Sequence, residues 1–208
     1  MQYRSERQQI VDFGRSLFDR GYAFGSSGNL SMRVHSGYIV TPTNQSLGEL
    51  NPASLSLLDE DWNLVDGEEP TKEIPMHRAF YRASTENSAV VHLHSTNATA
   101  VSCLLSEDSW TLPFLTPYMV MRLGLDIGVI PYLPPGDQRL EQEVDRVAGH
   151  SRAVLLRNHG LATTGKSLKA ATIAAEEFEE AAKLYLLLGN RPYVPLSPED
   201  LNELVQRS

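Results

Sequence analysis

The chain has 208 residues, of which 41% are hydrophobic and 21% are charged, and its formal net charge is −8. This acidic balance argues against nucleic-acid binding, while the single cysteine permits no internal disulfide and suits a reducing compartment. The N-terminus has no apolar signal core and no apolar run is long enough to span a membrane. We therefore expect a cytoplasmic protein with no membrane partner, whose residues 1–208 form one domain.

The first part of the chain predicts one helix followed by antiparallel strands. Apolar residues recur near helical spacing in SERQQIVDFGRSLFDRG, where Ser5 is the expected N-cap and Gly21 the expected end. The segments LSMRV and YIVTP flank HSG and predict a hairpin, and LSLLD and WNLV predict further antiparallel strands.

Strands and helices alternate after residue 70. Helices are predicted at EIPMHRAFYRA, with Pro75 in its first turn, at STNATAVSCLL, with Ser95 as its cap, and at DQRLEQEVDRVAG. A long helix, SLKAATIAAEEFEEAAKLYLLLG, is capped by Ser167 and ended by Gly189. The segments AVVHLH, DIGVIPYL and AVLLRNHG predict buried strands. The expected fold class is α/β, or α+β, with a mixed sheet and helices on its faces.

Histidines in AVVHLH and AVLLRNHG are candidate metal ligands. His92 and His94 are two residues apart in a predicted strand, so both side chains point to one face, roughly 6.5–7 Å apart. Imidazoles at this separation can converge on one ion, although two histidines satisfied within a core would show the same pattern. His159, where an apolar strand runs into a glycine turn, favours the metal site.

A metal site of this kind also needs a carboxylate, and Glu73 at a predicted helix start is the candidate. Favourable interaction with the helix dipole is the simpler explanation for a glutamate at that position. The remaining histidines, His35 in the hairpin turn, His77 on a helix and His150 in a Gly/Ser turn, are not expected to be ligands.

Three polar loops are candidate oxyanion sites, because short side chains and backbone N–H groups can surround a phosphate. The first follows the first helix, the second ends a strand, and the third precedes Glu73. Their candidate residues are Ser26, Ser27, Gly28 and Asn29; Thr43, Asn44, Gln45 and Ser46; and Thr71 and Lys72. A plain solvent turn is the alternative for the first loop.

The order of these motifs, GNLS, TPT, KE, HLHS, NHG and the final long helix, resembles the class II aldolase/adducin family over nearly the whole chain. The resemblance implies a three-layer αβα fold with a central, mostly antiparallel mixed sheet. It implies a divalent metal, usually Zn²⁺ with Mn²⁺ or Co²⁺ as alternatives, bound by His92, His94 and His159, and Glu73 as acid/base. It also implies that Ser27, Gly28, Asn29, Thr43, Asn44 and Thr71 bind the substrate phosphate.

Further segments, among them TKE…HRAFYR, VVHLHST, TPYMVMRLG and PYLPPGD, resemble the 3-oxo-tetronate 4-phosphate decarboxylase branch of this family. That resemblance implies decarboxylation to dihydroxyacetone phosphate and CO₂ through a metal-stabilised enediolate, in the catabolism of four-carbon sugar acids. An aldolase or epimerase acting on a phosphorylated ketose is the alternative enzyme, and an adducin-like interaction module is the non-enzymatic one. In our hypothesis Lys72 orients the substrate carboxylate or supports Glu73; a solvated lysine is the alternative.

The aldolases of this family complete each site with a tyrosine from a neighbouring subunit. Tyr118 and Tyr132 are the candidates for this role here, and either of them or Glu73 could donate the proton. The resemblance implies a homotetramer with inter-subunit active sites and a small phosphorylated sugar acid as substrate.

Overall fold

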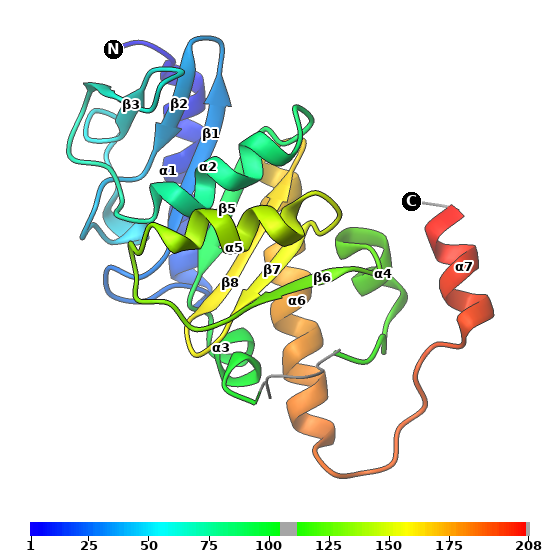
Figure 1. Ribbon diagram of the computed structural model, residues 1–208. Helices are drawn as coiled ribbons and strands as arrows, with labels where there is room; N and C mark the ends of the chain where they lie inside the picture. The colour runs from blue at the N-terminus through cyan, green and yellow to red at the C-terminus, as the bar shows by residue number, and fades with distance from the viewer. Residues whose placement is uncertain (105–111, 207–208) are drawn as a thin grey trace.

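The computed structural model describes residues 1–104 and 112–206, which form a layered α/β structure (Figure 1). The strands are β1 (Asn29–Val34), β2 (Gly37–Val40), β3 (Ser56–Leu58), β4 (Leu64–Asp66), β5 (Ala89–Leu93), β6 (Ile127–Ile130), β7 (Ala153–Leu156) and β8 (Gly160–Gly165). The helices are α1 (Arg4–Asp19), α2 (Ile74–Ala83), α3 (Thr96–Ser102), α4 (Pro117–Leu123), α5 (Arg139–Ala148), α6 (Leu168–Leu188) and α7 (Pro198–Gln206), with a 3-10 turn η1 (Leu47–Glu49).

The strands form one sheet in the order β4-β3-β2-β1-β5-β8-β7-β6. Within the described strands, β6 and β7 pair in parallel and every other ladder is antiparallel. The expected mostly antiparallel mixed sheet is therefore confirmed. The predicted hairpin of β1 and β2 is also confirmed, and the further antiparallel strands predicted at LSLLD and WNLV are β3 and β4, which pair with each other.

Helices cover both faces of this sheet, with α2 and α5 on one side and α1 and α6 on the other (Figure 1). Side chains of β5 pack into the apolar clusters on both faces of the sheet, because successive side chains of a strand point to opposite faces. Val91 and Leu93 pack in the cluster shared with α1 and α6, whereas Val90 packs with the α2 and α5 residues. The three-layer αβα architecture is confirmed, and the alternation places His92 on the α2 side.

Helix α6 begins and ends where the sequence predicted. The Ser167 hydroxyl accepts a hydrogen bond from the Ala170 N–H, and Gly189 follows the last helical residue with a φ of 55°. The prediction for α1 is wrong at its start, because Ser5 lies inside the helix and Tyr3 is the N-cap. The buried Arg7 guanidinium donates to the backbone carbonyls of Pro52 and Leu55, which fixes this first turn from outside the helix.

The segment AVLLRNHG is only partly a strand. Strand β7 stops at Leu156, the chain turns through Asn158 at a left-handed φ of 53°, and β8 begins at Gly160 and pairs back with β7. Strand β8 and the helices α4 and α7 were not predicted. No helix in the two described stretches combines the length and apolar character needed to cross a membrane.

Candidate metal centre

Neighbouring strands bring the predicted site residues to one end of the sheet. Strand β5 lies between β1 and β8, with Asn29 and Ala162 as the register partners of His92. His94 follows the last residue of β5, and His159 directly precedes β8. The four-residue site is completed by Glu73, the N-cap residue of α2.

Side chains of Glu73 and three histidines converge at this point. His92 Nε2 lies 2.9 Å from His94 Nε2, which lies 3.1 Å from His159 Nε2. The two Glu73 carboxylate oxygens face the same group, Oε2 at 3.2 Å from His92 Nε2 and Oε1 at 3.3 Å from His159 Nε2. Each of the four residues offers one ligand atom, and these four atoms lie within 4.8 Å of one another. We refer to Glu73, His92, His94 and His159 as the metal cluster.

Two glycines permit this close approach. A Cβ on Gly160 would lie 2.4 Å from the Leu93 carbonyl oxygen and 3.3 Å from the His94 Cα, so only glycine lets the β8 start lie against the end of β5. Gly28, at a φ of 82°, would place a Cβ 2.9 Å from the His92 carbonyl oxygen. The glycines in the motifs NHG and GNLS therefore have a steric role.

The donor set fits a divalent metal ion. The His92 Nδ1 lies 3.0 Å from the Leu161 carbonyl oxygen and donates to it, which leaves Nε2 as the free lone pair of the neutral ring. Nitrogens held around an ion by bonds of about 2.0–2.1 Å in tetrahedral geometry lie about 3.3 Å apart, close to the separations here. The buried Glu73 Oε1 has no hydrogen-bond partner, so a cation would satisfy it.

The protonation states also suit metal binding. Burial by itself would raise the pKa of Glu73, but the adjacent His92 and His159 and the hydrogen bond from Asn29 outweigh it and lower that pKa. Burial and the neighbouring ring of His92 lower the pKa of His94 to about 3 and that of His159 to about 4. At neutral pH these two histidines are neutral and Glu73 is ionised, the forms that bind metal.

The second and third predicted polar loops lie beside one another, and the third lies against Glu73. Thr71 accepts a hydrogen bond at Oγ1 from the Glu73 N–H, and its own N–H donates to Thr41. The Thr43 N–H donates to the Glu69 carbonyl, which joins the second loop to the third. Ser27 donates to the Phe24 carbonyl, within the first loop. The assignment of these loops to phosphate binding stays a prediction.

Asn29 occupies a different environment from the other loop residues. Its side chain is buried, donates from Nδ2 to Glu73 Oε2 over 2.8 Å and lies 2.5 Å from His77 Nε2 through Oδ1. The sequence did not predict that His77 and Asn29 would lie beside the metal cluster. The spacing of Glu73 and His77, four residues apart on one helix face, is a signal that could have indicated it.

A second unpredicted residue, Glu179 of α6, supports the other side of the cluster. Its carboxylate accepts hydrogen bonds from the Ser95 hydroxyl, from the Asn97 N–H and side chain, and from the Ala98 N–H. The predicted cap residue of α3, Ser95, is correctly placed, but its hydroxyl donates to Glu179 and does not cap the helix. Four glutamates share this part of α6, so sequence alone does not single out Glu179.

The structure does not bring Lys72 or the candidate tyrosines into hydrogen-bonded contact with the cluster within the described part of the chain. The Lys72 side chain is exposed. Its Cβ lies close to Gly136, since a Cβ added to Gly136 would be 3.2 Å from the Cβ of Lys72. Tyr118 on α4 is 58% exposed, and Tyr132, after β6, is 54% exposed. Their predicted roles remain predictions.

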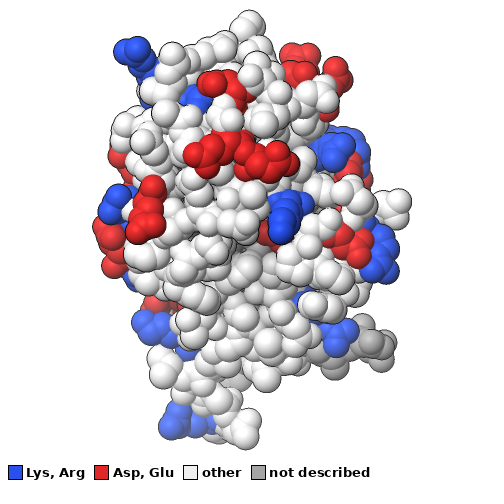
Figure 2. Space-filling view, turned by 90° about the vertical axis from the view of Figure 1, so that its left-hand side faces the viewer, with Lys and Arg blue, Asp and Glu red and all other residues white. Residues whose placement is uncertain are grey.

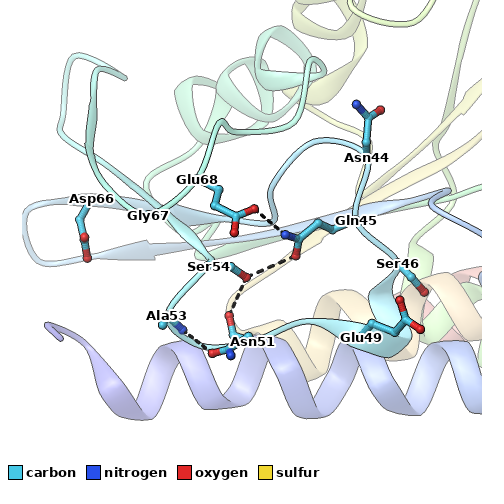
Figure 3. Close-up of a pocket in the computed structure, with 10 residues that line it drawn as sticks. All are labelled: Asn44, Gln45, Ser46, Glu49, Asn51, Ala53, Ser54, Asp66, Gly67 and Glu68. Atoms are coloured by element: carbon cyan, nitrogen blue, oxygen red, sulfur yellow. Dashed lines mark hydrogen bonds between the residues drawn. The ribbon is translucent and has the colours of Figure 1, made fainter.

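A cavity of about 700 Å³ lies next to the second polar loop, but its lining is acidic. Its walls include Glu49, Asp66 and Glu68, and acidic side chains gather across this face of the molecule (Figure 2). Figure 3 shows Gln45 linking Glu68 to another wall residue, with the Asn44 side chain pointing away from them. No cluster residue lines this cavity, and its charge disfavours a phosphate.

Comparison with known proteins gives a consistent result. The family model for the class II aldolase and adducin N-terminal domain matches residues 8–186. A curated relative from Pectobacterium atrosepticum, named 3-oxo-tetronate 4-phosphate decarboxylase, is 45% identical over 95% of this chain and 91% of the relative. A relative from Methanococcus maripaludis, named L-fuculose phosphate aldolase, is 35% identical over 88% of this chain and 97% of the relative. The crystal structure of YgbL from Klebsiella pneumoniae matches with a TM-score of 0.93 and 43% identity, covering 98% of this chain and 99% of that one.

Proposed function

Because this chain belongs to the class II aldolase and adducin family, we propose that it is a lyase that decarboxylates a 3-oxo-tetronate 4-phosphate to dihydroxyacetone phosphate and CO₂. Such a reaction belongs in the catabolism of four-carbon sugar acids. The observation that carries the proposal is the 45% identity, over 95% of the chain, to a relative named for this activity. The aldolase relative is 35% identical, so sugar-phosphate cleavage is the second candidate.

The metal we propose is Zn²⁺, with Mn²⁺ or Co²⁺ as alternatives. His92, His94 and His159 would hold it, and Glu73 is close enough to be a fourth ligand. Nitrogen-rich sites of this kind are typical of zinc. Once bound, the ion supplies Lewis-acid stabilisation of the negative charge that develops on the substrate oxygens.

The chemistry itself needs one bond broken and one proton added. The bond between the carboxylate carbon and C2 breaks, its electron pair moves onto C2 and into conjugation with the C3 carbonyl, and CO₂ leaves. A proton, ultimately from water, then adds to C2 and gives dihydroxyacetone phosphate. Glu73, which is ionised at rest, is the first candidate to take up this proton from water and pass it to C2, because Oε1 has no hydrogen-bond donor whereas Oε2 accepts from Asn29. Tyr118 and Tyr132 remain the other candidates.

Substrate binding is assigned to the polar loops and to Lys72. Ser27, Gly28, Thr43, Asn44 and Thr71 are the proposed phosphate-binding residues. The side chain of Asn29, which the resemblance also assigned to the phosphate, is instead held by Glu73 and His77. Lys72 would pair with the carboxylate that departs as CO₂, a group that an aldolase substrate lacks. Its position supports this role, because it directly precedes Glu73 and is exposed.

We further propose a cytoplasmic homotetramer whose active sites lie between subunits. The exposure of Tyr118 and Tyr132, 58% and 54%, is compatible with a contact to a second subunit. Light scattering of the purified protein tests this assembly. A monomer with full activity would contradict it, since the site would then be complete in one chain.

Two assays on the same preparation separate the candidate functions. The protein is offered 3-oxo-tetronate 4-phosphate, with dihydroxyacetone phosphate detected by a coupled enzyme, and separately dihydroxyacetone phosphate with short aldehydes. The decarboxylase forms dihydroxyacetone phosphate in the first assay and condenses nothing in the second. Condensation without decarboxylation would establish the aldolase instead.

A further inference from the structure

A chain of buried polar side chains runs from Glu73 into the space between strand β1 and helix α2. Strand β1 contributes Asn29 and Ser31, which are two residues apart and therefore share one face. Helix α2 and its N-cap contribute Glu73, His77 and Tyr81, which are spaced four residues apart and therefore share one side of the helix. None of these five residues is more than 6% exposed.

Each member of the chain contacts the next at hydrogen-bond distance. Asn29 Nδ2 lies 2.8 Å from Glu73 Oε2, and Asn29 Oδ1 lies 2.5 Å from His77 Nε2. His77 Nδ1 lies 2.7 Å from the Ser31 hydroxyl, which lies 2.8 Å from the Tyr81 hydroxyl. The metal cluster thus has a continuous polar connection that ends about two helical turns away, at Tyr81.

The protonation of Glu73 and His77 fixes the direction of every hydrogen bond. An ionised Glu73 only accepts, so Asn29 must present its NH₂ group to Oε2 and its carbonyl oxygen to His77. His77 Nε2 must then carry the proton that it donates to Asn29. Burial, and next the neighbouring ring of His92, lower the pKa of His77 to about 3, so the His77 ring is neutral and its Nδ1 accepts from Ser31. The Ser31 oxygen in turn accepts from Tyr81.

Each hydrogen bond of the chain is therefore donated in the same direction, from Tyr81 towards Glu73 Oε2. Hydrogen bonds aligned in this way polarise one another, and a buried polar network of this size costs stability compared with apolar packing unless every member is satisfied. The arrangement satisfies Oε2 and leaves Oε1, the oxygen facing His159, without a hydrogen bond. A purely structural network would not require this asymmetry between the two oxygens.

We propose that His77 is a positioning residue for Glu73: by donating to Asn29 it fixes the amide that holds Oε2, and it thereby keeps Oε1 turned towards the metal cluster, where the substrate would bind. This inference rests on the proposed function, in which Glu73 transfers a proton to the substrate. The His77 ring bonds to Asn29 and Ser31, and His77 reaches the metal cluster only through its backbone N–H, which donates to the Glu73 carbonyl within the helix. The effect of the ring on the Glu73 carboxylate therefore passes through Asn29.

A pair of substitutions at position 77 separates positioning from packing. In His77→Gln the amide nitrogen can replace Nε2 as the donor to Asn29, whereas His77→Leu fills a similar volume without a donor. We expect His77→Leu to lower kcat by about 10- to 100-fold, the range usual for residues that orient a site residue, with KM within about twofold. His77→Gln should retain kcat within about threefold, although both variants lose thermal stability.

The matched control is Phe80→Leu, in the same helix and fully buried but outside the polar chain. It should lower the melting temperature without lowering kcat by more than about twofold, as expected for a cavity in an apolar core. Equal kcat losses in His77→Leu, His77→Gln and Phe80→Leu would overturn the proposal, because kcat would then follow stability alone.

A double-mutant cycle tests the route through Asn29. If His77 acts through Asn29, His77→Leu lowers kcat little further once Asn29→Ala is present. Fully multiplicative losses would overturn the proposal.

The tautomer provides a readout that does not depend on the reaction. In ¹⁵N NMR spectra of the metal-free protein, His77 should carry its proton on Nε2, and a proton on Nδ1 would overturn the inference. If the native enzyme releases no CO₂ while His77 shows the expected tautomer, the proposed function fails and the hydrogen-bond chain stands.

Discussion

The Nε2 atoms of His92 and His94 lie 2.9 Å apart, although the two residues are successive same-face positions at the end of a strand, where side chains stand roughly 6.5–7 Å apart. Both rings therefore turn towards a common point, which His159 also faces. Because His92 donates from Nδ1 to a backbone carbonyl, its ring orientation is set by the protein itself.

We predict that His92→Ala weakens metal binding at least 100-fold, since it removes a ligand, and loss of an outer hydrogen bond alone costs 10–100-fold. Metal content after dialysis and competition with a chromophoric chelator measure the effect. His150→Ala, in an exposed turn, is the control and should retain one metal per chain. Unchanged affinity in His92→Ala would contradict the assigned ligand set.

Replacing Lys72 by Met should lower kcat/KM for CO₂ release by about 10- to 100-fold, because a charge-assisted hydrogen bond contributes about 1.5–3 kcal/mol. Lys72→Arg should recover part of the loss. The control is Lys166→Met, an exposed lysine paired with Glu86, which should not change the rate. A near-native kcat and KM in Lys72→Met would show that Lys72 is only a solvated lysine.

As the pH falls, the free energy of unfolding of the metal-free native protein should decrease more than that of the metal-free His77→Gln variant. The pKa of His77 is lowered from 6.5 to about 3 in the folded protein, so only the unfolded state takes up this proton as the pH falls below 6.5. The stabilising contribution is thus present above pH 6.5 and is lost as the pH falls towards the folded value.

Between about pH 5.5 and 4.5 the free energy of unfolding of the native sequence should fall by about 1.4 kcal/mol more than that of His77→Gln. Urea unfolding at each pH measures this difference. Parallel pH profiles for the two proteins would mean that His77 is protonated in the folded state as readily as in the unfolded state.

The capping role of Glu179 gives a stability prediction. Its carboxylate receives four hydrogen bonds from residues 95–98, directly after His94. Glu179→Gln places an NH₂ group against these donors, so we expect a loss of about 2–3 kcal/mol and a melting temperature lower by about 5–10 °C. Metal affinity should fall as well, because the chain after His94 is released.

Glu180→Gln is the matched control, one residue further along α6, where the carboxylate is exposed and bonded only to Lys183 among the contacts described. It should melt within about 2 °C of the native protein, as expected for an exposed ion pair. Equal melting temperatures for both variants would contradict the capping role.

Local sequence patterns predicted most of the helices and strands, because the interactions that begin and end these elements involve residues close together in the chain. Ser167 and Gly189 mark the ends of α6 through an N-cap hydrogen bond and a left-handed φ. Ser5 failed as the cap of α1 because the first turn of the helix is held by long-range hydrogen bonds from Arg7 to residues 52 and 55, which no local pattern shows. Strand β8 was missed although its pairing with β7, across the turn at Asn158, is local; its pairing with β5, in contrast, joins residues far apart in the chain.

In the candidate site, too, local patterns identified the residues, whereas the contacts between them depend on long-range packing. His92 and His94 were identified from the period of a strand, and His159 from a glycine turn, but their convergence needed the order β1-β5-β8. Asn29 was assigned to a phosphate loop from its neighbours, whereas the structure shows its side chain donating to Glu73. Which partner a buried amide selects is decided by packing between β1 and α2, and therefore could not be predicted from one segment.

The most direct test of the central claim measures both products of the metal-depleted and metal-restored enzyme acting on 3-oxo-tetronate 4-phosphate. The proposed function predicts equimolar CO₂ and dihydroxyacetone phosphate after Zn²⁺, Mn²⁺ or Co²⁺ is restored, and neither product after chelation. Release of CO₂ at an undiminished rate from the chelated enzyme, or no CO₂ from the restored enzyme, would contradict it.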